Sequence, residues 1–179
     1  MLNRIALPIV ALASIFSTGC SYMPVSFDVH TGGQTTIQKG TIAEGLVGTL
    51  GFGNLANLDI SSSQEFKSNN VQKRHVARAR LQELKLTITA PKEQNFDFLQ
   101  SITFFVEAPG LEKKRLAHRD VPRGARAFTC LIDDVELAPY VRADRMTITT
   151  TVNGHRPGAD TTLQADLTIN VGTVLWRGD

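Results

Sequence analysis

TLQADLTINV, residues 162–171, is the stretch that decides the fold of this chain. Apolar and polar side chains alternate along it without a break. A period of two residues predicts a β-strand with one face in a core and the other turned to solvent. The side chains expected in the core are Leu163, Ala165, Leu167, Ile169 and Val171. We expect this strand to be central to the fold.

Other segments repeat the alternation, and turn residues separate them. They are residues 25–30, 84–89, 102–106 and 144–152. A series of short strands with few helical segments between them is typical of two packed antiparallel sheets. The sequence therefore predicts an all-β fold, an antiparallel β-sandwich (Greek-key, immunoglobulin-like) of about eight strands with one or two short helices. An up-and-down barrel is the alternative.

The segment after the first strand carries two local predictions. Residues 31–34 (TGGQ) contain the glycine pair of a tight hairpin turn, which predicts a returning strand over 35–39. Residues 41–50 have apolar side chains at helical spacing, and Thr41 with Glu44 matches a capping box. We therefore predict a short helix over this second stretch.

Residues 42–60 are largely apolar, and they contain no Lys or Arg. One interpretation makes this segment a membrane-touching or lipid-binding element. The other makes it a crossover that plugs one end of the sandwich. Because interfacial helices usually carry basic residues, we favour the crossover.

The second half of the chain contains an expected edge strand and an expected buried strand. Residues 113–118 are highly charged, which suits the exposed edge of a sheet. Residues 127–132 (AFTCLI) are mostly apolar, which predicts a strand buried on both faces. Asp133 or Asp134 is expected to cap the helical turns that follow.

Length and charge limit the classes of protein to consider. Residues 25–179 suffice for a single domain with a real hydrophobic core. The chain has 19 basic and 17 acidic residues, a net charge of +2, and removal of residues 1–19 with Arg4 leaves 18 against 17. A nearly neutral chain lacks the dominant basic face of a nucleic-acid-binding protein, so we expect no nucleic-acid partner.

Sequence motifs for catalysis are missing. The chain has no G-x-S-x-G or P-loop motif, and no histidine has a second ligand at metal-binding spacing. Asp133, Asp134 and Glu136 could together hold calcium, but helix capping is the interpretation we favour. Cys130 lies in an apolar run and is expected to be a buried, unreactive thiol. We therefore expect no enzyme activity, no metal and no cofactor.

The first twenty residues have the organisation of a secretory signal peptide. A basic residue precedes a mostly apolar run over residues 5–16, which is shorter than the roughly 20 residues of a transmembrane helix. The next four residues, Ser17-Thr18-Gly19-Cys20, resemble the lipobox of bacterial lipoproteins. A plain secretory signal and an uncleaved membrane anchor are the alternatives.

The lipobox resemblance implies cleavage of a signal peptide over residues 1–19 and lipid attachment at Cys20. Residues 20–24 would form a lipidated tether, and the attached acyl chains would give stable membrane anchoring. Ser21, where inner-membrane lipoproteins have Asp, implies sorting to the outer membrane. The domain would then face the periplasm.

Basic residues crowd two parts of the chain. The candidate contacts with an anionic surface are Lys113, Lys114, Arg115, Arg119 and Arg123. Residues 73–80 add a second basic run. If the two runs were adjacent, they would suit phosphate-rich envelope components. The alternative, which we favour, is two solvated edges paired with acidic side chains.

These observations predict a non-enzymatic, lipid-anchored protein of the bacterial cell envelope that acts as a binding or structural module. Its expected partners are the membrane, through the anchor, and either another envelope protein or an anionic envelope lipid. The alternative is a carrier of an apolar ligand held between the sheets, with residues 42–60 as its lid. Such a carrier needs an apolar pocket of several hundred Å³.

Overall fold

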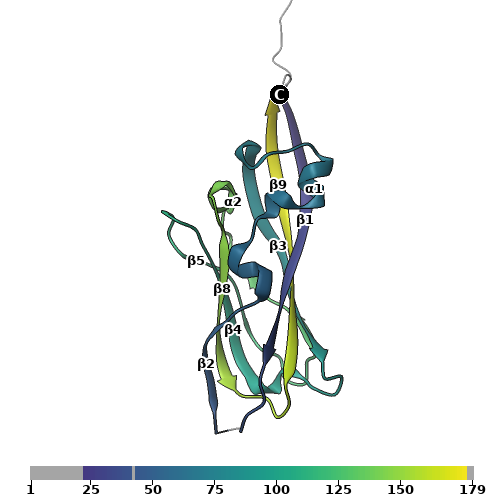
Figure 1. Ribbon diagram of the computed structural model, residues 1–179, viewed down its shortest axis with the longest axis vertical. Coiled ribbons are helices and arrows are strands. Elements are labelled where there is room, and N and C mark those ends of the chain that lie inside the picture. The colour runs from purple at the N-terminus through teal and green to yellow at the C-terminus, as the bar shows by residue number, and fades with distance from the viewer. Residues whose placement is uncertain (1–21, 42, 177–179) are drawn as a thin grey trace, which may run out of the picture.

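Two antiparallel β-sheets packed face to face form the domain, as Figure 1 shows. The computed structural model describes residues 22–41 and 43–176. These residues form nine strands and two short α-helices, so the predicted antiparallel β-sandwich is confirmed. No helix among them is long and apolar enough to cross a membrane.

The first sheet has four strands in the order β1-β9-β3-β6. Their bounds are β1 Tyr22–Ile37, β9 Thr161–Trp176, β3 Val76–Ala90 and β6 Ala127–Thr129. β9 pairs with all 16 residues of β1 on one side and with β3 on the other. The strand predicted over residues 163–171 is therefore central, as expected.

The second sheet has five strands in the order β2-β8-β4-β5-β7. Their bounds are β2 Gly45–Leu50, β8 Thr147–His155, β4 Leu99–Glu107, β5 Lys114–Asp120 and β7 Leu131–Ile132. The short β7 pairs only with Ala117 and His118 of β5. The charged β5 strand is therefore not the edge strand that its composition predicted, because β7 pairs with it; its first residues, from Lys114, have no strand beside them on that side.

Short helical segments connect the strands. The α-helices are α1 Gln64–Ser68 and α2 Ala138–Arg142, and the 3-10 helices are η1 Gly53–Asn57, η2 Ile60–Ser62, η3 Lys73–His75 and η4 Phe96–Phe98. Most of them turn an apolar side chain into the core: Leu55, Phe66 and Phe96 are fully buried. η1 contacts both β1 and β8, so it closes the side of the sandwich between these two strands.

The connections make a Greek key. β4, β5 and the β6–β7 segment follow one another in sequence and lie side by side, and β3, which precedes β4, pairs with β6. At Cys130, between β6 and β7, the chain passes from one sheet to the other. The strand order differs from that of an immunoglobulin domain. In the first sheet β9 lies between β1 and β3, whereas strands A and B of an immunoglobulin domain are direct neighbours.

The inward faces of the two sheets form one continuous core. Leu163 and Ile169 of β9 and Phe104 of β4 are fully buried. Burial of each such side chain stabilises the fold by about 1.5–3 kcal/mol. The outward face of β9 carries the polar residues of the alternating pattern, so the sequence period maps directly onto the two faces of the strand.

The hairpin predicted at residues 31–34 is wrong, and so is the returning strand. β1 continues without a break, and Gly33 lies opposite Ala165 of β9. This glycine permits a close approach of two backbones rather than a turn. A Cβ added at Gly33 would lie 2.3 Å from the carbonyl oxygen of Phe52. The glycine therefore makes room for the segment that begins η1.

The helix predicted over residues 41–50 is also wrong, because β2 occupies residues 45–50. Leu46 and Leu50 pack against the core, whereas Val47 and Thr49 are exposed, which is the alternation of an edge strand. Pairing with β8 prevails over a helical pattern that two glycines weaken by about 1 kcal/mol each.

The strand predicted over residues 127–132 is divided between the two sheets and is buried on one face only. Phe128 and Cys130 point into the core, whereas Leu131 is 53% exposed. β6 and β7 are edge strands of two different sheets. Their core-facing residues are buried, and the residues on the opposite face remain in solvent.

The two ends of the sandwich differ. Tyr22 and Trp176, the first and last described residues, lie opposite each other at what we call the terminal end. The loops that join β1 to β2, β3 to β4, β5 to β6 and β8 to β9 lie at the opposite end, the free end. A strand as long as β1 extends over about 50 Å, so the two ends are well separated.

Candidate functional site

The expected lipid-attachment residue, Cys20, and residues 1–19 lie outside the described residues. β1 begins at Tyr22, so it starts inside the tether expected over residues 20–24. The tether expected over residues 20–24 is therefore too long, because β1 pairs with β9 from Tyr22 onward. The first strand therefore begins two positions after Cys20.

Arg115 on β5 forms a two-pronged ion pair with Asp133. Its Nε donates to Asp133 Oδ2 at 2.6 Å, and its Nη2 donates to Oδ1 at 3.3 Å. The hydrogen bond from Arg115 holds the pKa of the Asp133 carboxyl below its usual range, and the same bond raises the pKa of the guanidinium. Nδ1 of His118 lies 3.7 Å from the same carboxylate. Arg115 is thus engaged within the domain.

Lys113 is also engaged by neighbouring side chains. Its Nζ lies 3.9 Å from Glu107 Oε2 and 5.0 Å from the centroid of the Phe105 ring. At an exposed site such contacts contribute about 0.5–1 kcal/mol each. Lys114 is exposed at the start of β5.

Arg119 and Arg123 lie toward the free end, away from the other three candidates. β5 runs from Lys114 to Asp120, a length of about 20 Å, and Arg123 follows in the loop after it. The structure therefore spreads the five candidate residues along one strand and a loop. It does not gather them at one point.

The acidic residues after β7 connect the two sheets. The prediction that Asp133 or Asp134 caps a helix is wrong, because Leu137 is the N-cap of α2 and the side-chain bond at the helix start comes from Glu136. Asp133 binds Arg115 of β5, and Asp134 forms an ion pair with Arg80 of β3. The end of the second basic run, with Arg80, thus lies in the other sheet, and the two runs approach each other at these aspartates.

Glu136 fastens the same connection to β3. Its Oε1 accepts hydrogen bonds from the backbone N–H of Ala79 at 2.7 Å and of Ala138 at 3.0 Å. Leu137 N donates to Ala79 O at 2.7 Å. Within the described ranges, no group of three His, Cys, Asp or Glu residues is placed to hold a metal ion.

A groove of about 520 Å³ opens toward the free end. Its lining residues are Asp97, Leu99, Gln100, Val121, Arg123 and His155. Asp97 Oδ1 accepts a hydrogen bond from Gly124 N at 2.6 Å, which joins the loop before β4 to the loop after β5. The guanidinium, imidazole, amide and carboxylate groups of the lining suit a polar ligand better than an apolar one.

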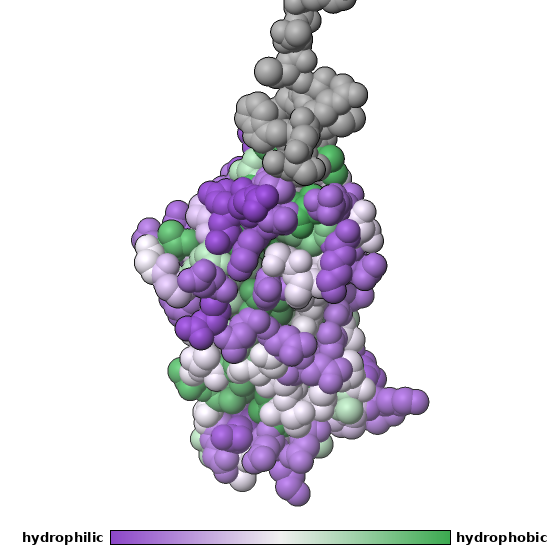
Figure 2. All heavy atoms as spheres, turned by 45° about the horizontal axis from the view of Figure 1, so that its top comes forward, coloured by the Kyte–Doolittle hydropathy of each residue, from purple (hydrophilic) through white to green (hydrophobic). Residues whose placement is uncertain are grey.

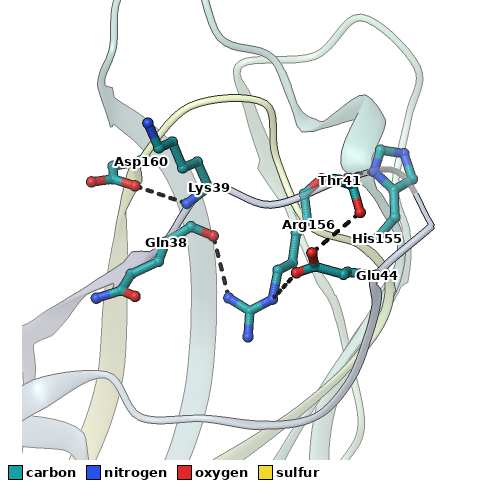
Figure 3. A network of polar contacts seen from close by, with 7 residues as sticks. All are labelled: Gln38, Lys39, Thr41, Glu44, His155, Arg156 and Asp160. Atoms are coloured by element: carbon teal, nitrogen blue, oxygen red, sulfur yellow. Dashed lines mark hydrogen bonds and ion pairs between the residues drawn. The ribbon is translucent and has the colours of Figure 1, made fainter.

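A second polar cluster at the free end was not predicted from the sequence. Figure 3 shows its members: Gln38, Lys39, Thr41, Glu44, His155, Arg156 and Asp160. Arg156 Nε lies 3.5 Å from Glu44 Oε2, and its Nη1 donates to Gln38 O at 3.3 Å. Lys39 N donates to Asp160 Oδ1 at 2.8 Å. These contacts tie the loop before β2 to the loop after β8 and so position β2.

The Thr41 and Glu44 pair, which predicted a helix capping box, belongs to this cluster instead. Thr41 Oγ1 donates to Glu44 Oε1 at 3.2 Å, which is the residue pair of the supposed capping box. The pair stabilises a loop here, because Arg156 rather than a helix N-terminus binds the carboxylate. Nothing local in the sequence connects Glu44 with Arg156.

Within the segment predicted as a crossover, residues 52–60 contribute four apolar side chains to the core: Phe52, Leu55, Leu58 and Ile60. Phe52, Leu55 and Ile60 are at most 3% exposed, and the Phe52 ring lies 5.9 Å from that of Phe104. The segment crosses between the sheets, as predicted, but it closes a side of the sandwich rather than an end.

Cys130 is buried and free of any disulfide, as the sequence predicted. Burial raises the pKa of its thiol to about 12. A thiol with so high a pKa is almost entirely protonated at neutral pH and is a poor nucleophile.

The exposed surface is polar over most of the face shown in Figure 2, with apolar residues in small separate groups. Among the described residues, the large apolar side chains with high exposure are Val47, Leu111 and Leu131. They lie on β2, on the β4–β5 loop and on β7, so they do not form one patch.

Comparison with known proteins identifies no family for this chain. No family model matches it, and no curated protein matches it. Among solved structures, it is similar to the BFDV capsid protein in a 60-mer, with 10% identity and a TM-score of 0.42 over 88% of this chain and 96% of that one. A decameric BFDV capsid protein gives 13% identity and a TM-score of 0.39 over 84% and 99%.

Proposed function

We propose that this protein is a lipid-anchored, non-enzymatic module of the bacterial cell envelope, attached through Cys20 to the outer membrane and facing the periplasm. The observation that carries the proposal is the stretch Ser17-Thr18-Gly19-Cys20 after an apolar run, which resembles the lipobox of bacterial lipoproteins. An anchor at Cys20 leads directly into a strand that pairs with β9 along its whole length. The domain would be held at its terminal end with only Ser21 between anchor and sheet.

The polar groups of the domain support a binding or structural role rather than catalysis. The carboxylates of Asp133, Asp134 and Glu136 bind arginines or backbone N–H groups that connect the two sheets. The Cys130 thiol is buried with a raised pKa. The groove that contains Arg123 is the surface we propose for a polar partner, another envelope protein or an anionic envelope component.

The carrier of an apolar ligand is the second candidate function. Its lid would be residues 42–60, and opening this lid would remove Phe52 and Leu55 from the core, where they are 2% and 0% exposed. Exposure of each side chain would cost about 1.5–3 kcal/mol. The packed core therefore favours the binding or structural module.

Mass spectrometry of the protein purified from the membrane fraction tests the proposal. We expect a chain that begins at Cys20 with the added mass of a diacylglyceryl group and an amide-linked acyl chain. Cys20→Ser should leave the membrane fraction or remain an unprocessed precursor. Cys130→Ser is the matched control and should remain lipidated. An apolar molecule that co-purifies in stoichiometric amount would favour the carrier instead.

A wild-type chain with an unmodified Cys20 would contradict the anchor. So would a Cys20→Ser variant that stays in the membrane with the mass of a lipidated species. Either result would leave the fold unaffected, because the described residues begin after the anchor.

A further inference from the structure

β2 is a free edge of the second sheet. In Figure 1 its outer side faces away from the molecule. The other edge strands in the described part of the chain are accompanied or very short: η1 and α1 lie along β1, β6 has 3 residues and β7 has 2. β2 has 6 residues and contains no proline or charge, which are the features that usually protect an edge.

The backbone of β2 directs donors and acceptors outward. Arg156 N donates to Glu44 O at 3.1 Å, which makes these residues a hydrogen-bonded pair at the end of the β2–β8 ladder. Hydrogen-bonded and non-hydrogen-bonded pairs alternate in an antiparallel ladder. Residues 46, 48 and 50 therefore bond to β8, and residues 45, 47 and 49 turn their N–H and C=O groups away from it.

The sequence of this edge is nearly symmetric about Gly48. Residues 45–51 are GLVGTLG, with a glycine at each end and a leucine next to each glycine. Val47 and Thr49, both β-branched, flank the centre. A second copy placed antiparallel about a two-fold axis at Gly48 sets Val47 opposite Thr49 of that copy. Both residues have outward backbone groups, so they can form the hydrogen-bonded pair that the ladder requires.

We propose that β2 is the docking surface for a second copy of this chain. The two β2 strands pair antiparallel about Gly48 and join two five-stranded sheets into one continuous sheet. The contact is isologous, because the same patch is used on both copies. On the core side Leu46 of one copy faces Leu50 of the other, which extends the apolar face of the sheet.

Charge and exposure agree with this contact. Residues 45–58 include no charged side chain, so no like charges face each other across the two-fold axis. Glu44, at the end of the strand, is already paired with Arg156. Val47 is 78% exposed in the single copy, and in the pair its side chain lies beside Thr49 of the other copy.

The two-fold axis is perpendicular to the strands, so the terminal ends of the two copies point in opposite directions. Anchors at the two ends can reach one bilayer when the long axis of the dimer lies along its surface. The dimer follows from β2 alone and does not depend on the lipid anchor.

Disulfide cross-linking of the full chain tests the register. Two differently tagged forms, Val47→Cys and Thr49→Cys, are expressed together and oxidised in intact cells, so that the test does not depend on the anchor. We expect the mixed pair to give about ten times more cross-linked dimer than either form alone, because only its Cα atoms lie opposite at about 5.5 Å, within disulfide range. The unsubstituted chain is the control for Cys20 and Cys130.

Charge substitutions at the same positions provide an independent readout of the dimer by chemical cross-linking of lysines and by native mass spectrometry. The Val47→Lys/Thr49→Lys variant places like charges opposite each other and should lose most of the dimer. The Val47→Lys/Thr49→Glu variant places opposite charges together and should keep it. Both sites are exposed, so both variants should fold.

Three outcomes would overturn the proposal. The mixed cysteine pair could cross-link no more than the unsubstituted chain. Val47→Cys could cross-link with itself more strongly than in the mixed pair, which would show another register. The introduced thiols could cross-link a different protein in place of a second copy, which would make β2 a docking strand for a foreign partner.

Discussion

Arg115 of β5 and Asp133, which follows β7, hold two strands together through a two-pronged ion pair. The contact lies where the chain has just passed from the first sheet to the second. Asp134 extends the link to Arg80 of β3 in the other sheet. A cluster that looked like a calcium site or helix cap in the sequence therefore joins the sheets at one side of the sandwich.

The lowered pKa of Asp133 predicts a dependence of stability on pH. A carboxyl whose pKa is lower in the folded than in the unfolded state stabilises the fold above its unfolded pKa, about 3.9, and loses this contribution as pH falls through the folded value. Asp133→Asn should therefore be less stable than wild type at pH 7, and the difference should shrink at pH 3. Urea unfolding at both pH values measures it.

Arg115→Gln in the Asp133→Asn background is the control for that experiment. It should change stability little, because the partner carboxylate is already gone. Added salt should reduce the effect of Asp133→Asn alone, because the pair is partly exposed. A difference that is the same at pH 7 and pH 3 would contradict the role assigned to the ion pair.

Leu167 on β9 should be among the positions most sensitive to truncation. It is 2% exposed in the middle of the central strand. Leu167→Ala should lower the free energy of unfolding by about 2–5 kcal/mol, through lost burial and the cavity left behind. The next residue, Thr168, is the matched control on the outer face, where its Oγ1 lies 3.2 Å from His30 Nδ1. Thr168→Ala should cost about 1 kcal/mol or less, and equal losses in urea unfolding would mean that both faces are buried.

Gly33→Ala should destabilise the domain although alanine is usually tolerated in a strand. The added Cβ would lie 2.3 Å from Phe52 O and 3.3 Å from Leu55 Cγ, so the η1 segment must shift. Such overpacking costs about 1–3 kcal/mol. Gly158→Ala is the control, because nothing lies within 4 Å of its added Cβ. Thermal unfolding should show a lower Tm for the first variant alone.

The Cys130 thiol should resist alkylation while the domain is folded. With a pKa of about 12, about one molecule in ten thousand carries the thiolate at pH 8. The Cys20→Ser variant leaves Cys130 as the single thiol, so maleimide labelling reports on it alone. We expect labelling only when urea unfolds the protein, and rapid labelling without urea would show that the site opens in the native state.

The local sequence pattern was sufficient to predict the strands that have one face exposed to solvent. The alternation over residues 162–171 and the pattern around residues 102–106 predicted strands that the structure contains, because the period of two is a direct consequence of the pleat. The burial of Cys130 also followed from its apolar neighbours. These features depend on residues close together in the chain.

Local pattern was misleading where a distant segment supplies the deciding contact. Gly33 looked like a turn residue, but its role is to admit Phe52. Thr41 and Glu44 looked like a helix cap, but Arg156 binds the glutamate and holds β2 against β8. Asp133 was expected to be a helix cap or a metal ligand, but in the folded domain its carboxylate binds Arg115.

The sequence by itself determined the class of fold and the central strand, because side-chain period carries that information, and the anchor at Cys20 stays a prediction. Tertiary structure alone decided which strands are neighbours, where the groove with Arg123 lies, and that the symmetric stretch around Gly48 is a free edge. Pairing partners are chosen by packing between segments far apart in the chain. The alternation of residues within one segment does not specify the partner strand, because the apolar face of that segment can pack against any other apolar face.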